Sequence, residues 1–336
     1  MTALIKSTGH KGYSASSVTT FEACEQKYNY EYVQLYRKKE KSLGLKTGIT
    51  MHDAQEMYMR GHGLEAVIDS IEQDVKSKGW DQEDPLFLPK IRAYTKGYYN
   101  RWEKEDAYSF AERGFKVLGV EEEFSYLVDD VSLQPEIKYV GKIDAILDDG
   151  DYIYLMEHKN VSSKDAQDPT SVFWQSLQMN NQLTIYADYL RRHALGDDRI
   201  GVKILYDVVI TSPATKPKIV DRKTKRRETI KEFEDRLTDM YRYESDRFVR
   251  KEWAVVEQNV DRRMDEINAI AWKMKEHDQP IRNTTACNNY GGCEFFQCCI
   301  GTERVDESSK FEKVDRPHVE LTATFADWKK RQKETE

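Results

Sequence analysis

Apolar residues recur at helical spacing along the first third of the chain and gather into strand-like runs after it. A first helix, which Ser16 or Ser17 can cap, is predicted by residues three or four positions apart: Phe21, Cys24, Tyr28 and Tyr32. Cys24 would therefore face inward. Further helices are expected from near Thr47 through MHDAQEMYM, over residues 64–79 and over residues 94–105.

The pattern changes to strands in the middle of the chain. Strand-like runs, the first of them a single strand or a bulged pair, predict an antiparallel meander over residues 115–128, 138–147 and 152–159. A long helix is then expected from Thr170 to about His193, followed by an apolar strand over residues 202–210. Two more helices are expected over 228–250 and 259–276. This order of elements predicts an α/β fold.

Three charged residues lie in or at the end of two of these runs. Asp144 lies in KYVGKIDAIL, and Glu157 and Lys159 close YIYLMEHK. On a strand, Glu157 and Lys159 share one face while the carbonyl of His158 stays free, and pairing across DDGD would bring Asp144 beside Glu157. Such hard oxygen ligands suit Mg²⁺ or Mn²⁺, and the lysine can orient a water or a phosphate. The alternative is a solvated hairpin with ordinary ion pairs.

Two helices carry further candidate residues. His52 lies on the second predicted helix, where an imidazole could bind a catalytic metal, although a lone helical histidine is more often structural. Gln182 and Tyr186 are four residues apart and share a helix face, so they could reach a phosphate or a base at the edge of the site. Polar positions on an exposed stripe are the alternative for this pair.

The overall charge gives no sign of nucleic-acid binding, but one segment does. The chain has a formal net charge of −7, yet residues 216–227 are strongly basic. Within that segment Lys223, Lys225, Arg226 and Arg227 are candidate DNA contacts, with a solvated loop as the alternative. No apolar stretch is long enough to span a bilayer, and the N-terminus lacks a signal-peptide core, so a cytoplasmic location is expected.

The five cysteines are unevenly placed along the chain. Cys24 stands alone, and the others lie near the end, at positions Cys287, Cys293, Cys298 and Cys299. Four thiolates can hold Zn²⁺ or an iron-sulfur cluster, and the composition does not choose between them. Unpaired thiols are the remaining alternative. From about Thr302 the chain is poor in apolar residues, so we expect a loosely ordered or surface-bound polar tail over residues 302–336.

Six motifs in a fixed order carry a family resemblance. They are SASSVTTFEAC, GITMH, GKIDAI, YLMEHK, QLTIY and CNNYGGCEFFQCC. In this order the chain resembles the RecB-like branch of the PD-(D/E)XK nucleases. Its members with an iron-sulfur cluster include CRISPR-associated RecB-like exonucleases, the AddB nuclease domain and small phage homologues. The resemblance spans roughly residues 14–300, which implies one nuclease domain with a restriction-endonuclease-like core, a mixed sheet flanked by helices and a helical accessory region.

The resemblance implies roles for particular residues. His52, Asp144, Glu157 and the backbone carbonyl of His158 would bind Mg²⁺ or Mn²⁺, and Lys159 would be the catalytic lysine. Gln182 and Tyr186 would form the motif that follows it. Cys24 and three late cysteines, Cys287, Cys293 and Cys299, would hold a [4Fe-4S] cluster.

This chain departs from the family pattern in three places. Ile143 precedes the catalytic aspartate where proline is common, and five residues rather than two separate the first late cysteines. Cys298 and Cys299 are adjacent, and the closing interval of the family favours Cys299, with Cys298 as the alternative.

The expected activity is that of a metal-dependent deoxyribonuclease, in particular an exonuclease in DNA recombination, repair or end processing. Its partners would be single-stranded DNA or duplex ends. Because the chain has no G-x-x-x-x-G-K-[ST] phosphate loop, unwinding would fall to a separate helicase or recombination partner. Two other hypotheses remain at this point. One is a catalytically silent DNA-binding iron-sulfur module of a larger nuclease or helicase assembly, and the other is a zinc-stapled structural protein.

Overall fold

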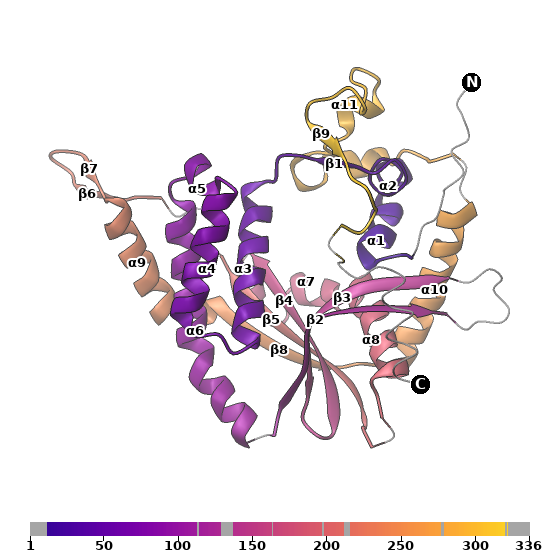
Figure 1. The fold of residues 1–336 in the computed structure, drawn as a ribbon, viewed down its shortest axis with the longest axis horizontal. Helices are drawn as coiled ribbons and strands as arrows, with labels where there is room; N and C mark the ends of the chain where they lie inside the picture. The colour runs from indigo at the N-terminus through magenta and orange to yellow at the C-terminus, as the bar shows by residue number, and fades with distance from the viewer. Residues whose placement is uncertain are drawn as a thin grey trace.

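A five-stranded mixed sheet with helices on both faces forms the centre of the molecule (Figure 1). The computed structural model describes residues 12–112, 114–128, 137–162, 164–196, 198–211, 216–276, 279–319 and 321. The strand order is β2-β3-β4-β5-β8. This arrangement confirms the predicted α/β class with a mixed sheet between helices.

The first three strands form the predicted antiparallel meander. They are β2 (Lys116–Leu127), β3 (Lys138–Asp148) and β4 (Tyr152–Val161). β5 (Gly201–Ile210) lies parallel to β4, which requires a crossover connection between them. The connection carries a 3₁₀ turn (Lys164–Gln167), α7 (Val172–Leu177) and α8 (Asn181–His193).

Two helix predictions in this region are wrong. The helix expected from Thr170 to about His193 is broken between α7 and α8, where the side chain of Asn180 accepts a hydrogen bond from the Gln182 amide and so caps α8. The helix expected over 228–250 ends early. There α9 (Ile230–Tyr243) is followed by a 3₁₀ turn (Ser245–Arg247) and by β8 (Phe248–Ala254), which pairs antiparallel with β5 at the sheet edge.

The N-terminal third is helical as predicted, except that the first predicted helix is interrupted at Cys24, whose backbone is extended, and that its N-cap is a different serine. Ser14, rather than Ser16 or Ser17, caps α1 (Ala15–Ala23) through a reciprocal pair of hydrogen bonds with Ser17. After α2 (Glu25–Tyr28), a π-helical turn (Asn29–Val33) and β1 (Tyr36–Lys38), the chain forms four helices. These are α3 (Leu43–Met59), α4 (Leu64–Ser77), α5 (Trp80–Glu83) and α6 (Phe87–Glu112).

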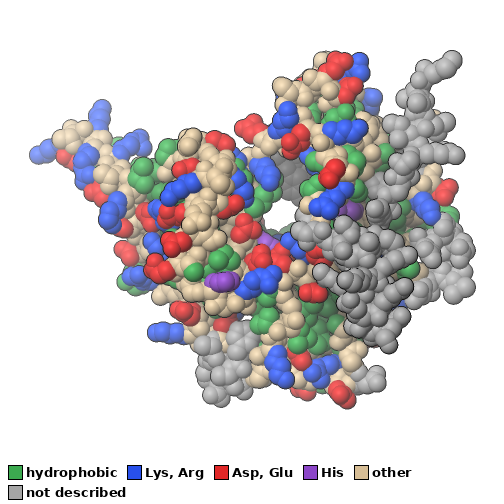
Figure 2. Space-filling model, in the orientation of Figure 1, with side chains coloured by type: hydrophobic (Ala, Val, Ile, Leu, Met, Phe, Trp, Pro, Cys, Tyr) green, Lys and Arg blue, Asp and Glu red, His purple; other side chains and the backbone are tan. Residues whose placement is uncertain are grey.

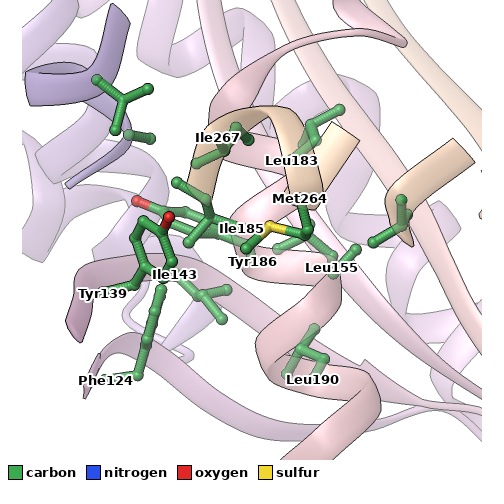
Figure 3. Close-up of a cluster of buried hydrophobic side chains, with 14 of the residues drawn as sticks. Phe124, Tyr139, Ile143, Leu155, Leu183, Ile185, Tyr186, Leu190, Met264 and Ile267 are labelled. Carbon is green, nitrogen blue, oxygen red and sulfur yellow. The ribbon is translucent and has the colours of Figure 1, made fainter. Parts of the chain in front are cut away.

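Two hydrophobic clusters cover the two faces of the sheet. On one face α8 and α10 (Glu257–Glu276) pack on β3, β4 and β5, and Figure 3 shows Ile143, Leu155, Ile185, Tyr186 and Ile267 meeting there. On the other face α3, α4, α6 and α9 pack through a second cluster built largely of aromatic rings. Among the described helices, none combines the length and the apolar character needed to cross a membrane.

The C-terminal segment returns to the N-terminal helices. After a 3₁₀ segment (Thr284–Gly291) and α11 (Phe296–Cys299), β9 (Phe311–Lys313) pairs antiparallel with β1. Phe311 stacks on Phe295, and His318 and Leu321 are also buried. Residues 302–319 therefore lie on the surface, which was one of the two expectations for the tail, and a few buried apolar residues suffice to fix this mainly polar segment. Apart from Leu321, the rest of the tail lies outside the described residues.

Candidate active site

The candidate site lies where β3 and β4 separate. The two strands pair only through residues 145–148 and 153–156, although both continue beyond that ladder. Asp144 is the first residue past the last pair and lies opposite Glu157 in the register. The amide of His158 donates to Asp144 Oδ2 at 2.8 Å, so the carboxylate takes the place of a backbone acceptor. The predicted proximity of Asp144 and Glu157 along the hairpin is confirmed.

Helix α3 brings His52 to the same point. His52 Nε2 lies 2.9 Å from Asp144 Oδ1, while Asp144 Oδ2 faces the backbone of β4. Burial alone would lower the pKa of His52, but the hydrogen bond and charge of Asp144 raise it to about 9. Burial alone would raise the pKa of Asp144, but His52 brings it below its ordinary value. His52 is thus part of this charged cluster.

Lys159 links the carboxylates to α8. It forms an ion pair with Glu157, and its Nζ donates to Gln182 Oε1 at 3.1 Å. Burial would lower the pKa of Lys159, yet the nearby charge of Glu157 raises it above its ordinary value, so the side chain stays an ammonium. The predicted placement of Glu157 and Lys159 on one face of the strand is confirmed, and Gln182 on α8 contacts Lys159.

Tyr186 contributes packing more than an open functional group. Its ring lies against β3 at Gly141, where a Cβ would come within 2.7 Å of both Tyr186 and Phe124. Its hydroxyl hydrogen-bonds to the backbone of Lys142 and to Gln182, and burial raises its pKa well above the ordinary value. Glycine at position 141 therefore lets α8 approach β3 closely enough to hold Gln182 in place.

Glu157 is deeply buried and incompletely partnered. Only 2% of its side chain is exposed, and among the described residues its Oε2 has no hydrogen-bond partner. Burial, and then the charge of Asp144, raise the pKa of Glu157 to about 7. A buried carboxylate oxygen without a donor costs free energy that a bound cation would recover.

Glu121 is a member of the site that the sequence patterns did not single out. Its neighbours Val120 and Glu122 pair with Ala145 and Ile143, so Glu121 lies opposite Asp144. Ligand atoms of His52, Glu121 and Asp144 lie within 4.8 Å of one another. The three consecutive glutamates at 121–123, in a strand with apolar neighbours, were the signal available in the sequence.

The opposite face of β4 carries a different buried polar network. The ring of His158 points there, with Nδ1 2.9 Å from Oδ2 of Asp207 on β5. Arg250 Nε donates to Asp207 Oδ1 at 3.1 Å, and the hydroxyl of Tyr98 donates to Oδ2. Arg250 also pairs with Asp106 on α6. This network fixes β4, β5, β8 and α6 together directly behind the backbone of His158.

The cysteines from the two ends of the chain meet at one cavity. A cavity of about 300 Å³ is lined by four of them, Cys24, Cys287, Cys293 and Cys299. The lining does not include Cys298. No three sulfurs of the described cysteines come within 4.8 Å of one another, whereas a tetrahedral zinc site holds its sulfurs about 3.8 Å apart.

The basic segment forms a hairpin away from the carboxylates. β6 (Ile219–Asp221) and β7 (Arg226–Arg227) project beyond the end of α9 (Figure 1), and blue side chains mark this arm in Figure 2. Asp221, its one acidic residue, accepts the amides of Lys223 and Thr224 in the turn. Arg226 pairs with Glu232, while Lys223 and Lys225 are exposed and have no ion-pair partner among the described residues.

The sequence of the chain matches a known protein family. A family model described as the PD-(D/E)XK nuclease superfamily matches residues 13–300. No curated protein matches the chain. Among solved structures, the crystal structure of a candidate exonuclease from Eubacterium rectale aligns with a TM-score of 0.45 and 12% sequence identity, covering 87% of this chain and 88% of that chain.

Proposed function

This chain belongs to the PD-(D/E)XK nuclease superfamily, and from that premise we propose that it is a divalent-cation-dependent deoxyribonuclease that hydrolyses phosphodiester bonds. We further propose that it acts as an exonuclease on DNA ends during recombination or repair. The observation that carries the proposal is the meeting of His52, Asp144, Glu157 and Lys159 where β3 and β4 separate.

The donors present fit Mg²⁺ or Mn²⁺. Carboxylate and carbonyl oxygens with one imidazole are suitable ligands, and the unpartnered Oε2 of Glu157 supplies a buried oxygen that a cation would satisfy. We propose that His52, Asp144, Glu157 and the carbonyl of His158 hold the cation. When bound, it would lower the pKa of a water molecule and offset the charge of the phosphate.

The side chains around the cation have separate tasks. The Lys159 ammonium, held between Glu157 and Gln182, donates hydrogen bonds to the attacking water or to a phosphate oxygen. Gln182 fixes the direction of that ammonium, and Tyr186 fixes α8 against β3. His52 Nε2 lies within hydrogen-bond distance of Asp144 Oδ1, and it would have to be without its proton to serve as a ligand of the cation.

The β6–β7 hairpin is the proposed DNA contact outside the active site. Lys223, Lys225, Arg226 and Arg227 lie on an exposed arm whose one acid is engaged in its own turn. Uncompensated lysines on a projecting ribbon favour contacts with phosphates, which give affinity without sequence preference. A salt-dependent loss of DNA affinity on replacing Lys223 and Lys225 with alanine would support this role.

The cysteine cavity is the proposed site of a [4Fe-4S] cluster held by Cys24, Cys287, Cys293 and Cys299. The proposal rests on four thiols that line one cavity of about 300 Å³. A cluster binds each thiolate through a separate iron, so it holds the sulfurs farther apart than one ion does. Iron and sulfide counts with visible absorbance of anaerobically purified protein test it, and a colourless, zinc-loaded protein would contradict it.

Cleavage of labelled DNA tests the proposed activity. Linear DNA labelled at the 5′ or 3′ end, with a circular control, is incubated with purified protein and Mg²⁺ or Mn²⁺. We expect shortening of the linear DNA that Asp144→Asn abolishes. Asp148→Asn is the matched control, because Asp148 lies on the same strand but pairs with Arg199. Intact DNA under every condition, or cleavage by the Asp144→Asn variant, would refute the proposal.

A further inference from the structure

The geometry around β2 points to a residue of the cation site beyond those already named. We infer that Glu121 is an additional ligand of the divalent cation, and that Lys142 holds its carboxylate while the cation is absent. The inference rests on the proposed cation site and adds to it a ligand, together with the counter-ion that the cation displaces.

Backbone geometry sets Glu121 apart from the rest of β2. Its φ is 56°, in the left-handed region that a glutamate rarely adopts. The residue interrupts the regular pairing between Val120 and Glu122, at the position opposite Asp144. A non-glycine residue in this conformation is sterically disfavoured, so the surrounding structure holds Glu121 there against its local preference.

The carboxylate of Glu121 is buried, and one of its two oxygens has a partner among the described residues. Its side chain is 8% exposed, and Oε2 forms an ion pair with Lys142. Oε1 has no hydrogen-bond partner among the described residues and lies 3.5 Å from His52 Nε2. Two buried carboxylates, Glu121 on β2 and Glu157 on β4, flank Asp144 on β3, and among the described residues each has one oxygen without a hydrogen-bond partner. A cation held by His52, Glu121 and Asp144, whose ligand atoms lie within 4.8 Å of one another, would give the free oxygen of Glu121 a partner.

The charges around the carboxylates indicate which lysine would leave when a cation binds, and that lysine is Lys142. In the described structure the carboxylates of Glu121, Asp144 and Glu157 face three basic groups. The two lysine side chains are similarly exposed, but Lys159 is held by Gln182 as well as by Glu157, whereas Lys142 has Glu121 as its one ion-pair partner among the described residues. Binding a cation beside Glu121 would therefore release Lys142 rather than Lys159.

Direct binding of Mn²⁺ to the protein tests the inference without DNA or cleavage. Free Mn²⁺ is measured by electron paramagnetic resonance during titration of chelator-treated protein at fixed pH. Glu121→Gln is expected to weaken binding about tenfold or more. The neighbouring Glu122→Gln, which removes an exposed carboxylate from the same strand, is expected to leave affinity within about twofold.

A double-mutant cycle separates ligation from simple pairing. Lys142→Met is expected to strengthen Mn²⁺ binding severalfold, because the competing ammonium is gone. The Glu121→Gln loss should persist in the Lys142→Met background. If that background erases the loss, Glu121 serves only as a partner of Lys142 and the inference is overturned.

Two further variants keep the test decisive. Glu121→Asn suits the left-handed backbone and removes the charge, so it replaces Glu121→Gln if the latter fails to fold. Asp144→Asn reports on the site as a whole. Wild-type protein that binds no Mn²⁺ would contradict both the proposed function and this inference. Binding that Asp144→Asn weakens but that neither Glu121 variant affects would overturn the inference alone.

Discussion

Two buried carboxylates on neighbouring strands, Glu157 on β4 and Asp207 on β5, have opposite surroundings. Asp207 lies beside His158 in the parallel register, one step beyond Glu157, and both its oxygens receive hydrogen bonds. Burial alone would raise the pKa of Asp207, but Arg250 and His158 hold it well below the usual range. Burial and Asp144 instead raise the pKa of Glu157 to about 7, and one of its oxygens has no hydrogen-bond partner among the described residues.

The difference shows that donors, more than depth, decide what a buried carboxylate does. Asp207 has the partners that make a charge structural, and it fixes the strand whose backbone carries the carbonyl of His158. Glu157 pairs with one ammonium, that of Lys159, and its Oε2 has no hydrogen-bond partner among the described residues. It can therefore still bind a ligand. One face of β4 thus contacts the structural network around Asp207, and the other carries Glu157 of the proposed active site.

The largest effect is expected from Asp207→Asn. Removing one member of a buried ionic network leaves Arg250 without its main counter-charge, and breaking such a network costs about 3–5 kcal/mol of unfolding free energy. Urea denaturation at pH 7 measures it. Asp235→Asn, which removes an exposed pair with Lys231, serves as the control and should cost less than about 0.5 kcal/mol. Equal losses in the two variants would refute the structural role of Asp207.

The pH dependence of this loss has a defined sign. Because the folded-state pKa of Asp207 lies below its unfolded value of about 3.9, its stabilisation is fully present above that value and disappears as the pH falls. The gap between wild type and Asp207→Asn should therefore be constant from about pH 5 to 8 and narrow below about pH 4.

The second effect is stabilisation by the cation. At a Mn²⁺ concentration of about 100 times Kd, the unfolding free energy should rise by about 2.7 kcal/mol, because only the folded state assembles the site. Thermal denaturation with and without Mn²⁺ measures this gain. Glu157→Gln should lose most of the gain, and an Asp207→Asn protein that folds should keep it. The reverse outcome would exchange the roles assigned to the two carboxylates.

A third, smaller effect is the pH response of Glu157→Gln without cations. For a carboxyl whose folded-state pKa is raised, stability falls as the pH rises from the unfolded pKa, about 4.3, through the folded pKa of about 7. The variant lacks this penalty, so it should gain roughly 1–3 kcal/mol on the wild type between pH 5 and pH 8. Chelator-treated protein in urea reports this shift. A gap that does not change with pH would contradict the raised pKa.

The smallest effect is expected from Gln182→Leu. Lys159 would lose one acceptor and keep Glu157, so the unfolding free energy should change by about 1 kcal/mol or less. Cleavage should nevertheless slow, because the direction of the ammonium is no longer fixed. Denaturation and single-turnover cleavage of the same preparation test both halves. A large loss of stability would mean that Gln182, like Asp207, mainly stabilises the fold.

Much of the centre of the molecule followed from residue patterns. The strands of Asp144 and Glu157 are apolar runs with clear turn signals, and alternation placed Glu157 and Lys159 on one face. The place of His52 beside Asp144 followed from the resemblance to a family, since helical spacing alone left it ambiguous.

Other features depend on contacts between distant segments. β8 escaped prediction because Arg250, Lys251 and Glu252 make FVRKEWA look like a helix surface until Asp207 and Asp106 appear as the partners of Arg250. The role of Glu121 depends on a left-handed backbone that no local preference favours. The pairing of β1 with β9 joins residues too far apart for any periodicity to connect.

The pairing of β1 with β9 also has a consequence for biosynthesis. Among the described residues, the strand partners of Tyr36 to Lys38 are Phe311 to Lys313, and Arg37 donates to the carbonyl of Pro317. A growing chain therefore exposes the β1 edge until nearly all of the described protein has left the ribosome. Closing so long a loop is also slow relative to local helix formation. The N-terminal segment is thus synthesised early and becomes fully folded late.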